Sequence, residues 1–398
     1  MEGVKVVDLT WVAFGPWVTK YLADHGAEVI KIESTTRPDI IRLSPPYKDN
    51  KAHPDRAGLF TVFNSSKRSL TLNLKNPKGL ELLSKLVTWA EVVVENMGVG
   101  AMKNLGLGYE QLVKFKPDII MVSMSILGQT GPLSSFQGFG PHGAALSGVY
   151  ALTGWPDGEP VSNTLAWPDC VCPWYATTAI MAALDYKRRT GKGQFIDISQ
   201  VEATIHGFAP AMLRYSASNE VTGRMGNRCA EAAPHGVFRC QSFDRWCAIA
   251  VWDDAQWNAL CKVMGKEEWA NDPRFATLKG RKANEDMMEK AIDQWTSAQT
   301  SEEVMKKLQA VGVPAGVVQN AENLFADPQL AHRQHFPKLD HPVMGKTTHP
   351  SWPAKFSASP AQLKPAPTLG QDNEYVCTTI LGLSDQEFIE LVNSGVLE

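Results

Sequence analysis

A single acidic residue, Asp169, interrupts a long apolar stretch and is the first candidate for chemistry. It is the one charged residue between positions 161 and 184, and Trp167, Pro168 and Trp174 surround it. The residues that follow predict a buried helix, so Asp169 can be an N-cap whose carboxylate accepts hydrogen bonds from first-turn amides. Such a carboxylate stays ionised beside the helix dipole while apolar neighbours exclude water. It therefore also suits covalent catalysis, in which it attacks an activated acyl carbon.

Two histidines, His142 and His235, each follow a proline in a short segment that also holds glycine, GPHG and APHG. We expect both segments to be loops, where an imidazole can act as a base or a ligand. A lone loop histidine is more often only a surface residue, and neither histidine has an evident partner in the sequence. Both interpretations stay open.

Gly138, Gly140 and Gly143 form a GxGxxG pattern. A dinucleotide fingerprint of this kind must lie between a strand and a helix, with an acidic residue about 20 positions further on. Here no strand leads into the pattern and Pro141 lies inside it. We therefore predict a flexible loop and no nicotinamide cofactor.

The composition argues against several classes of protein. The 39 Lys and Arg residues balance 42 Asp and Glu residues without a basic stripe, which argues against a nucleic-acid partner. Gly, Ser and Pro interrupt the uncharged stretches too often for a membrane helix. Seven scattered cysteines and a start, MEGVKVVDLT, without a signal-peptide pattern predict a cytoplasmic protein. Cys170 and Cys172 have the wrong spacing for a zinc site, so we expect no metal.

The first half of the chain alternates strands with helices. A β-branched run at 4–9, a turn at Gly15-Pro16, a helical stretch at 17–25 and a strand at 27–32 form a βαβ opening. Long crossovers of this kind imply a parallel sheet covered on both faces, so the fold class is α/β. The other elements expected here are strands at 69–74, 91–95, 119–125 and 194–199, and helices at 78–89 and 169–189.

The pattern of expected secondary structure changes near residue 223. A hairpin at 237–251 and helices at 254–264, 284–298 and 301–311 predict a smaller α+β unit. Seven prolines between 337 and 367 exclude a continuous helix there and predict an extended connector. A capping box starts the last helix, 384–393. The expected organisation is a large domain at 1–200, a linker at 201–222, a small domain at 223–336, a Pro-rich linker at 337–367 and a return to the large domain at 368–398.

Seven segments resemble the class III CoA-transferases, the family of formyl-CoA transferase, carnitine CoA-transferase and α-methylacyl-CoA racemase. They occur in the order found in that family and cover nearly the whole chain. The matching segments are residues 4–33, NSSKRSLTLNLKNPKG, VVVENMGVGAMKNLGLGYE, VSMSILGQTGP, TGKGQFIDISQVEA, APHGVF and the closing PTLGQDNEYV with LGLS.

The resemblance implies a Rossmann-like large domain built from both ends of the chain, a small α+β domain, and two interlocked subunits. It also implies a coenzyme A site on the large domain, where phosphates and adenine need cationic charge and an apolar slot. An arginine usual in the family is replaced by Ser34, so Arg37 or Arg42 is expected to take a CoA phosphate. The other expected CoA-binding residues are Val12, Phe14, Leu72, Lys75, Asn96, Met97, Gly98 and Lys103.

By the same resemblance, Asp169 is the nucleophile. Its carboxylate would form an anhydride with the donor acyl group, then an aspartyl-CoA thioester, and then pass CoA to the acceptor acid. Backbone amides at the start of its helix or near Gly140 would stabilise the oxyanions. The substrate pocket is expected to include Phe139, Gly140, His142 and His235.

Two departures from the family pattern bear on which acceptor and which reaction are expected. The stretch GRMGNRCAEAAPHG lacks the glycine run of formyl-CoA transferase, which argues against oxalate as acceptor. Phe139 stands where the racemase branch has a histidine, and racemisation needs two bases. An acyl-CoA racemase or epimerase that uses His142 stays an alternative, as does one subunit of a heteromeric CoA-transferase instead of a homodimer.

The sequence leaves several substrates open. Succinyl-CoA is a plausible donor. Tryptophans that could wall an apolar pocket point weakly to a bulky or aromatic acid, as in the benzylsuccinate CoA-transferases, and carnitine-like and phenyl-lactate-like acceptors also stay open. The tryptophans concerned are Trp11, Trp17, Trp167 and Trp174.

Overall fold

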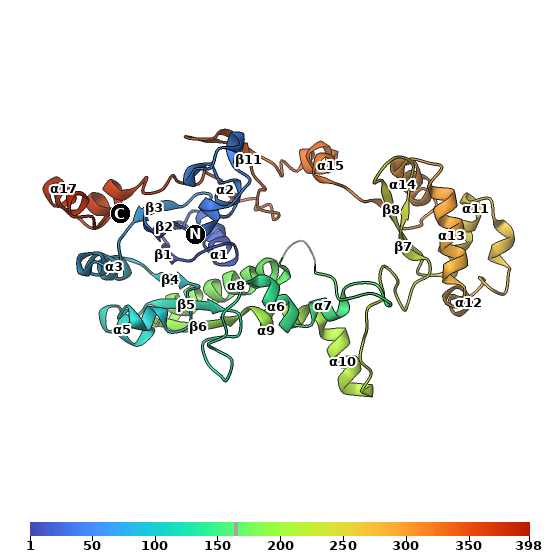
Figure 1. Ribbon diagram of the computed structural model, residues 1–398, viewed down its shortest axis with the longest axis horizontal. Coiled ribbons are helices and arrows are strands. Elements are labelled where there is room, and N and C mark those ends of the chain that lie inside the picture. The colour runs from blue at the N-terminus through green and yellow to red at the C-terminus, as the bar shows by residue number, and fades with distance from the viewer. Residues whose placement is uncertain (163–165) are drawn as a thin grey trace. The chain divides into compact units, whose positions relative to one another are not determined.

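A six-stranded parallel sheet organises the first of two compact units in the computed structural model, which describes residues 1–162 and 166–398 (Figure 1). The strand order is β3-β2-β1-β4-β5-β6, and every neighbouring pair is parallel. The described residues of this unit are 1–149, 166–220 and 329–398. Its strands are β1 (Lys5–Leu9), β2 (Glu28–Glu33), β3 (Arg68–Thr71), β4 (Val92–Glu95), β5 (Ile120–Ser125) and β6 (Gln194–Ser199).

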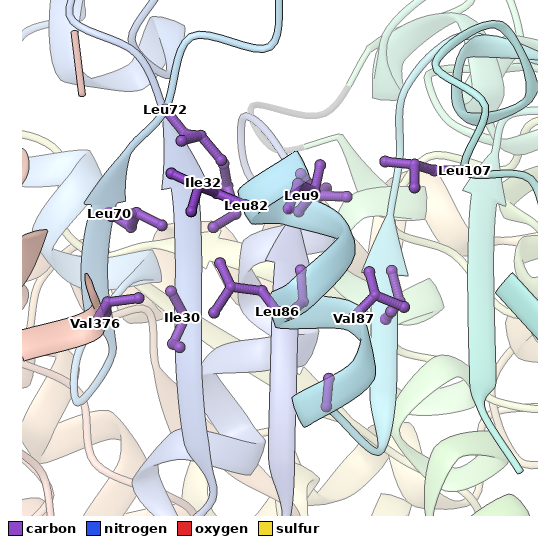
Figure 2. Close-up of a cluster of buried hydrophobic side chains, with 14 of the residues drawn as sticks. Leu9, Ile30, Ile32, Leu70, Leu72, Leu82, Leu86, Val87, Leu107 and Val376 are labelled. Atoms are coloured by element: carbon purple, nitrogen blue, oxygen red, sulfur yellow. The ribbon is translucent and has the colours of Figure 1, made fainter. Parts of the chain in front are cut away.

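Helices cover both faces of this sheet, as the alternating pattern predicts. One face packs on α3 and on C-terminal residues such as Val376, and Figure 2 shows Leu82, Leu86 and Val87 of α3 lying over the strands. The other face packs on α1 and α8 through side chains such as Val18 and Ile180. Since both faces are buried, the central strands are mainly apolar, and the charged residues within them, such as Asp8 of β1 and Lys31 of β2, are buried as well. The predicted α/β fold is confirmed.

The helices expected in this unit from the sequence are present as α1, α3, α8 and α17, with ends that differ by up to three residues. Helix α8 ends at Thr190 and is followed by Gly191, whose φ of +73° provides the left-handed cap. Ser384 and Glu387 form the expected capping box of α17. The helices are α1 (Phe14–Asp24), α2 (Gly58–Phe63), α3 (Pro77–Trp89), α4 (Ala101–Asn104), α5 (Tyr109–Phe115), α6 (Gly140–Leu146), α8 (Trp167–Thr190), α9 (Gln200–Ile205), α10 (Ala209–Ser218), α17 (Asp385–Asn393) and a π-helix (Tyr375–Ile380).

The second unit contains residues 150–162 and 221–328. The expected hairpin is present as β7 (His235–Arg239) and β8 (Trp246–Ala250), and β9 (Ala315–Val317) adds a third antiparallel strand. One face of this sheet packs on helices around the fully buried Trp257. Those helices are α11 (Asp254–Val263), α12 (Leu278–Ala283), α13 (Glu285–Thr296) and α14 (Ser301–Gln309), and α15 (Ala321–Ala326), which has no buried residue, follows β9. Two short helices, α7 (Val149–Leu152) and α16 (Pro328–His332), lie where the chain passes from one unit to the other.

Three local expectations need correction. The Gly140 to Gly143 segment is not a loop, because α6 begins at Gly140 and Pro141 occupies its first turn. Proline is favoured there, since the first-turn amides have no partner inside the helix. The Pro-rich connector contains an antiparallel hairpin, β10 (Lys338–His341) with β11 (Gly345–Thr348). The stretch 201–222, expected as a linker, holds most of α9 and all of α10.

Candidate active site

The carboxyl ends of the parallel strands carry the residues of interest. The chain adds β2 and β3 on one side of β1 and then β4, β5 and β6 on the other, so the strand order reverses between β1 and β4. Ligands of such sheets bind in the crevice outside the carboxyl ends of the strands at this reversal. Two features lie at this end of the sheet, a cleft beside β1–β4 and a carboxylate beside β6.

The cleft has a volume of about 700 Å³ and is lined from the ends of β1, β2, β3 and β4. Its floor is apolar, with side chains such as Leu9 and Ile32. Two cationic side chains, Arg37 and Lys75, line the cleft. The Arg37 guanidinium lies 5.5 Å from the centre of the Trp11 ring. Six of the residues expected to bind CoA line this cleft, namely Arg37, Leu72, Lys75, Asn96, Met97 and Gly98.

The remaining expected CoA-binding residues do not line the cleft. Phe14 begins α1 and is buried in the core between α1 and the sheet. Val12 has a φ of +69°, and its N–H donates to Asp39 Oδ1 at 2.9 Å. Lys103 is exposed on α4.

Arg42, the alternative phosphate ligand, is fully buried and already paired. Its guanidinium contacts Glu33 at 2.9 Å and Asp55 at 2.8 Å. A buried guanidinium with two carboxylate partners, one of them the buried Glu33, cannot also serve a phosphate without leaving those charges unpaired. Arg37 is thus the arginine of the two that reaches the cleft.

Asp169 lies in the first turn of α8, but the N-cap interpretation is wrong. The helix starts two residues earlier, at Trp167, and its N-cap is Ala166, which has no side-chain cap. The Asp169 carboxylate instead accepts a hydrogen bond at Oδ1 from Gln200 Nε2, at 2.6 Å. Burial raises the pKa of Asp169 to about 6, and the Gln200 bond opposes that shift. At neutral pH the group is therefore mostly ionised, but its charge has little compensation.

The second oxygen of this carboxylate faces the backbone of Gly140. A Cβ at position 140 would lie 2.3 Å from Asp169 Oδ2 and 2.4 Å from the Cβ of Ala166. Any larger residue would displace the carboxylate, so glycine is required by this close approach. The start of α6 and the start of α8 thereby meet at Oδ2.

The two histidines lie in different units. His142 is the third residue of α6, is exposed, and its Nδ1 accepts a hydrogen bond from the Phe139 N–H at 3.1 Å. Phe139, its N-cap, is 58% exposed. His235 belongs to the second unit, begins β7 rather than lying in a loop, and contacts the Asn227 carbonyl at 2.6 Å.

Gln200 was not among the predicted residues. It is the first residue of α9, directly after β6, and is almost fully buried. One signal could have indicated it: a polar residue that follows the carboxyl end of a parallel strand lies at the edge where ligands bind. Nothing in its spacing, 31 residues after Asp169, indicates the contact itself.

Comparison with known proteins defines the class. The model of CoA-transferase family III matches residues 1–373, so the chain belongs to this family and is an enzyme of the CoA-transferase class. It is 30% identical to human succinyl-CoA:glutarate CoA-transferase over all of this chain and 90% of that protein. It is also 30% identical to succinyl-CoA–D-citramalate CoA-transferase of Chloroflexus aurantiacus, over 100% of this chain and 98% of that one.

Solved structures agree with this assignment. A CAIB/BAIF family protein from Brucella suis superposes with a TM-score of 0.87 at 32% identity, covering 95% of this chain and 98% of that chain. Among the described residues, none of the helices is both long enough and apolar enough to span a membrane. The same part of the chain contains no cluster of three or more His, Cys, Asp or Glu side chains suited to a metal ion.

Proposed function

We propose that this CoA-transferase carries the acyl group and then CoA on Asp169. The observation that supports this role most directly is the state of its carboxylate. One oxygen accepts a hydrogen bond from Gln200, the other lies against the backbone of Gly140, and burial raises the pKa of the group to about 6. A carboxylate that is ionised yet poorly stabilised is a better nucleophile than one that is fully paired.

The proposed transfer of CoA through Asp169 consumes no ATP, because each step exchanges one acyl bond for another. Asp169 attacks the donor thioester carbon, the CoA thiolate leaves, and a mixed anhydride forms. The thiolate then attacks the aspartyl carbon, which releases the donor acid and leaves an aspartyl-CoA thioester. The acceptor carboxylate displaces the thiolate to form a second anhydride, and the thiolate finally attacks the acceptor carbon. Acceptor-CoA leaves and the Asp169 carboxylate is regenerated.

The cleft at β1–β4 is the proposed site of the CoA nucleotide. Arg37 and Lys75 provide the positive charge that phosphates need, and the Trp11 ring offers a flat apolar surface for adenine. The space beside the Cα of Gly98 is open, since a Cβ built there would meet nothing within 4 Å, so a ligand can lie against this part of the backbone.

Succinyl-CoA is the proposed donor, and a dicarboxylic acid of the glutarate or citramalate type is the proposed acceptor. The support comes from relatives that cover the whole chain and are named for these substrates. An acetyl-CoA:oxalate CoA-transferase from Acetobacter aceti is 34% identical over 93% of this chain, so oxalate belongs in the test. The aromatic acceptor expected from the tryptophans stays a prediction.

Trapping the covalent intermediate tests this proposal. Succinyl-CoA with hydroxylamine should give a hydroxamate at Asp169, read as a mass change on the peptide that contains it. In a panel of acids, glutarate should accept CoA faster than oxalate or an aromatic acid. Full transferase activity of an Asp169→Ala variant would refute the covalent role.

The epimerase alternative makes a different prediction. His142 Nδ1 is already engaged by the Phe139 N–H, which leaves only Nε2 for a proton transfer. An epimerase would introduce deuterium beside the thioester without exchanging CoA. Native mass would separate a homodimer, at twice 43.7 kDa, from a heteromer.

A further inference from the structure

The β1–α1 loop, residues 10–13, is held by side chains from distant parts of the chain. Lys31 Nζ donates to the Thr10 carbonyl at 2.7 Å. The Trp11 N–H donates to Asn96 Oδ1 at 2.7 Å, and Asn96 Nδ2 donates back to the Trp11 carbonyl at 3.0 Å. Three successive backbone polar groups of a loop are thus satisfied by residues of β2 and of the segment after β4.

Asp39 holds the next backbone group of this loop. Its Oδ1 accepts the Val12 N–H at 2.9 Å, and its Oδ2 lies 3.1 Å from Lys31 Nζ. Val12 has a φ of +69°, a region that a β-branched residue rarely adopts. Such a conformation persists only where the surroundings determine it. The ion pair fixes this conformation from both sides of Trp11. Lys31 binds the carbonyl of Thr10, and Asp39 binds the N–H of Val12.

The Lys31–Asp39 pair is fully buried, as is the Asp8–Lys67 pair of the same unit, but both of its side chains also bind the backbone of the β1–α1 loop. Replacement of a buried ion pair by apolar residues is often neutral for folding, so stability alone does not explain why such a pair is present. Trp11, between the two gripped residues, presents its ring to the cleft beside Arg37.

We propose that the buried Lys31–Asp39 pair is a positioning device that fixes the β1–α1 loop so that Trp11 is placed for CoA binding. This inference rests on the proposed CoA site. Lys31 and Asp39 act through the loop backbone and touch no substrate, so they are positioning residues and not catalytic ones. The pair fixes the loop before the ligand arrives, which lowers the ordering cost of binding.

The test replaces the pair with apolar residues and measures free CoA binding together with loop motion. The double variant Lys31→Met/Asp39→Leu removes both grips without leaving a lone buried charge. We expect the Kd for CoA, measured by calorimetry, to rise at least about tenfold. We expect the Trp11 and Val12 amides of the ligand-free protein to exchange with solvent at least about tenfold faster. The KM for acyl-CoA should rise while kcat changes less than about threefold.

A second buried pair in the same unit is the matched control. Lys20 and Asp24 of α1 form an ion pair with side chains 5% and 1% exposed, and Asp24 also accepts the Ser65 hydroxyl at 2.9 Å. The variant Lys20→Met/Asp24→Leu removes equal charge at the other end of α1. We expect unchanged CoA affinity and unchanged exchange at residues 10–13.

The single variant Asp39→Asn tests the role if the double variant does not fold. It keeps an oxygen for the Val12 N–H but loses the charge that faces Lys31, so we expect a smaller rise in Kd. A folded variant of either kind with the exchange and CoA affinity of the wild type would overturn the positioning role. Faster exchange combined with no CoA binding by the wild type would support the loop grip and refute the CoA assignment of the cleft.

Discussion

Asp8 is a fully buried and Asp169 a half-buried carboxylate of the first unit, and their pKa values shift in opposite directions. Burial alone would raise the pKa of Asp8, but Lys67 at 2.9 Å, Lys31 and two threonine hydroxyls outweigh burial and lower it. Burial likewise acts on Asp169, where Gln200 is the opposing contact, and there the pKa rises to about 6. The difference lies in the compensation of the charge and not in the degree of burial.

This contrast indicates which carboxylate can react. A nucleophile must offer its electron pair, and every cation or hydroxyl that stabilises the ion lowers its reactivity. Asp8 uses its oxygens to hold Thr10, Thr19 and Lys67 together, so its charge is structural. Asp169 accepts one side-chain hydrogen bond from the described residues, at Oδ1 from Gln200, and its Oδ2 lies beside Gly140. The same side chain thus serves the fold at one site and the proposed chemistry at the other.

Removal of the Asp169 carboxylate should give the largest effect on activity. We expect Asp169→Asn to lower kcat by at least about 10³-fold, since the proposed covalent step has no other nucleophile. Stability should not fall. Because the folded pKa lies above the unfolded value, ionisation of the side chain lowers stability as pH rises from about 3.8 to about 6, and this loss stays constant at higher pH. Initial rates and thermal unfolding at pH 8 check both statements, and a stability loss without an activity loss would reverse the assignment.

Removal of the Asp8 charge should have the opposite profile. Asp8→Asn leaves the buried Lys67 ammonium without its ion-pair partner, which should lower the free energy of unfolding by about 3–5 kcal/mol. The folded pKa of Asp8 is lowered, so this contribution is present above the unfolded value and is lost as pH falls through the folded pKa. Urea unfolding at pH 7 measures the loss. A double change, Asp8→Asn with Lys67→Met, should recover part of it, and a loss below about 1 kcal/mol in the single variant would contradict the structural role.

Gly140 tests whether the free space beside Asp169 matters. We expect Gly140→Ala to lower kcat about 100-fold, because its Cβ would lie 2.3 Å from Oδ2 and a shift of about 1 Å at a reacting atom has an effect of this size. Gly143, in the same helix, is the matched control, since a Cβ there would meet Pro168 at 3.4 Å, near ordinary contact. Equal activities of the two alanine variants would mean that the space at Oδ2 is not used.

The parallel sheet was predictable because its strands are β-branched runs separated by helical crossovers. The sequence singles out Asp169 because an isolated charge in an apolar stretch is costly and needs a reason, and its catalytic role stays a proposal. Its helix boundary was not predicted correctly, since Pro168 belongs to the first turn and the helix starts at Trp167. The loop prediction for Gly140 and Pro141 is wrong for a similar reason, since proline in a first turn is also a signal of a helix start.

Contacts between distant residues set the limit of prediction from the sequence. The link from Gln200 to Asp169 depends on how β6 and α8 lie together, and the grip of Lys31 and Asp39 on the β1–α1 loop depends on the register of β1 with β2. Neither residue pair has a spacing that indicates contact. Composition and periodicity specify elements, whereas the compensation of each buried charge is a property of their packing.

The smallest expected effect comes from Gln200 and sharpens the contrast with Asp8. Its hydrogen bond lowers the pKa of Asp169 from the value that burial alone would set, so Gln200→Leu should move the pKa above about 6. The carboxylate is the reactive form, so kcat/KM should rise with pH through this pKa, and the variant profile should be displaced to higher pH. We expect a loss of about tenfold in kcat/KM near pH 6, in keeping with one hydrogen bond to a charged group, and a smaller loss at pH 8.

Thr204→Val is the control on the same helix, because its hydroxyl donates to the Gln200 carbonyl at 2.7 Å and the side chain is fully buried. It weakens α9 without removing the Nε2 contact, so its profile should keep the wild-type inflection. If Gln200→Leu lowers the rate equally at every pH, Gln200 contributes only to the geometry of Oδ1. A displaced inflection would instead show that the single amide of Gln200 does for Asp169 what Lys67, Lys31 and the threonines do for Asp8, at a strength low enough to leave the carboxylate reactive.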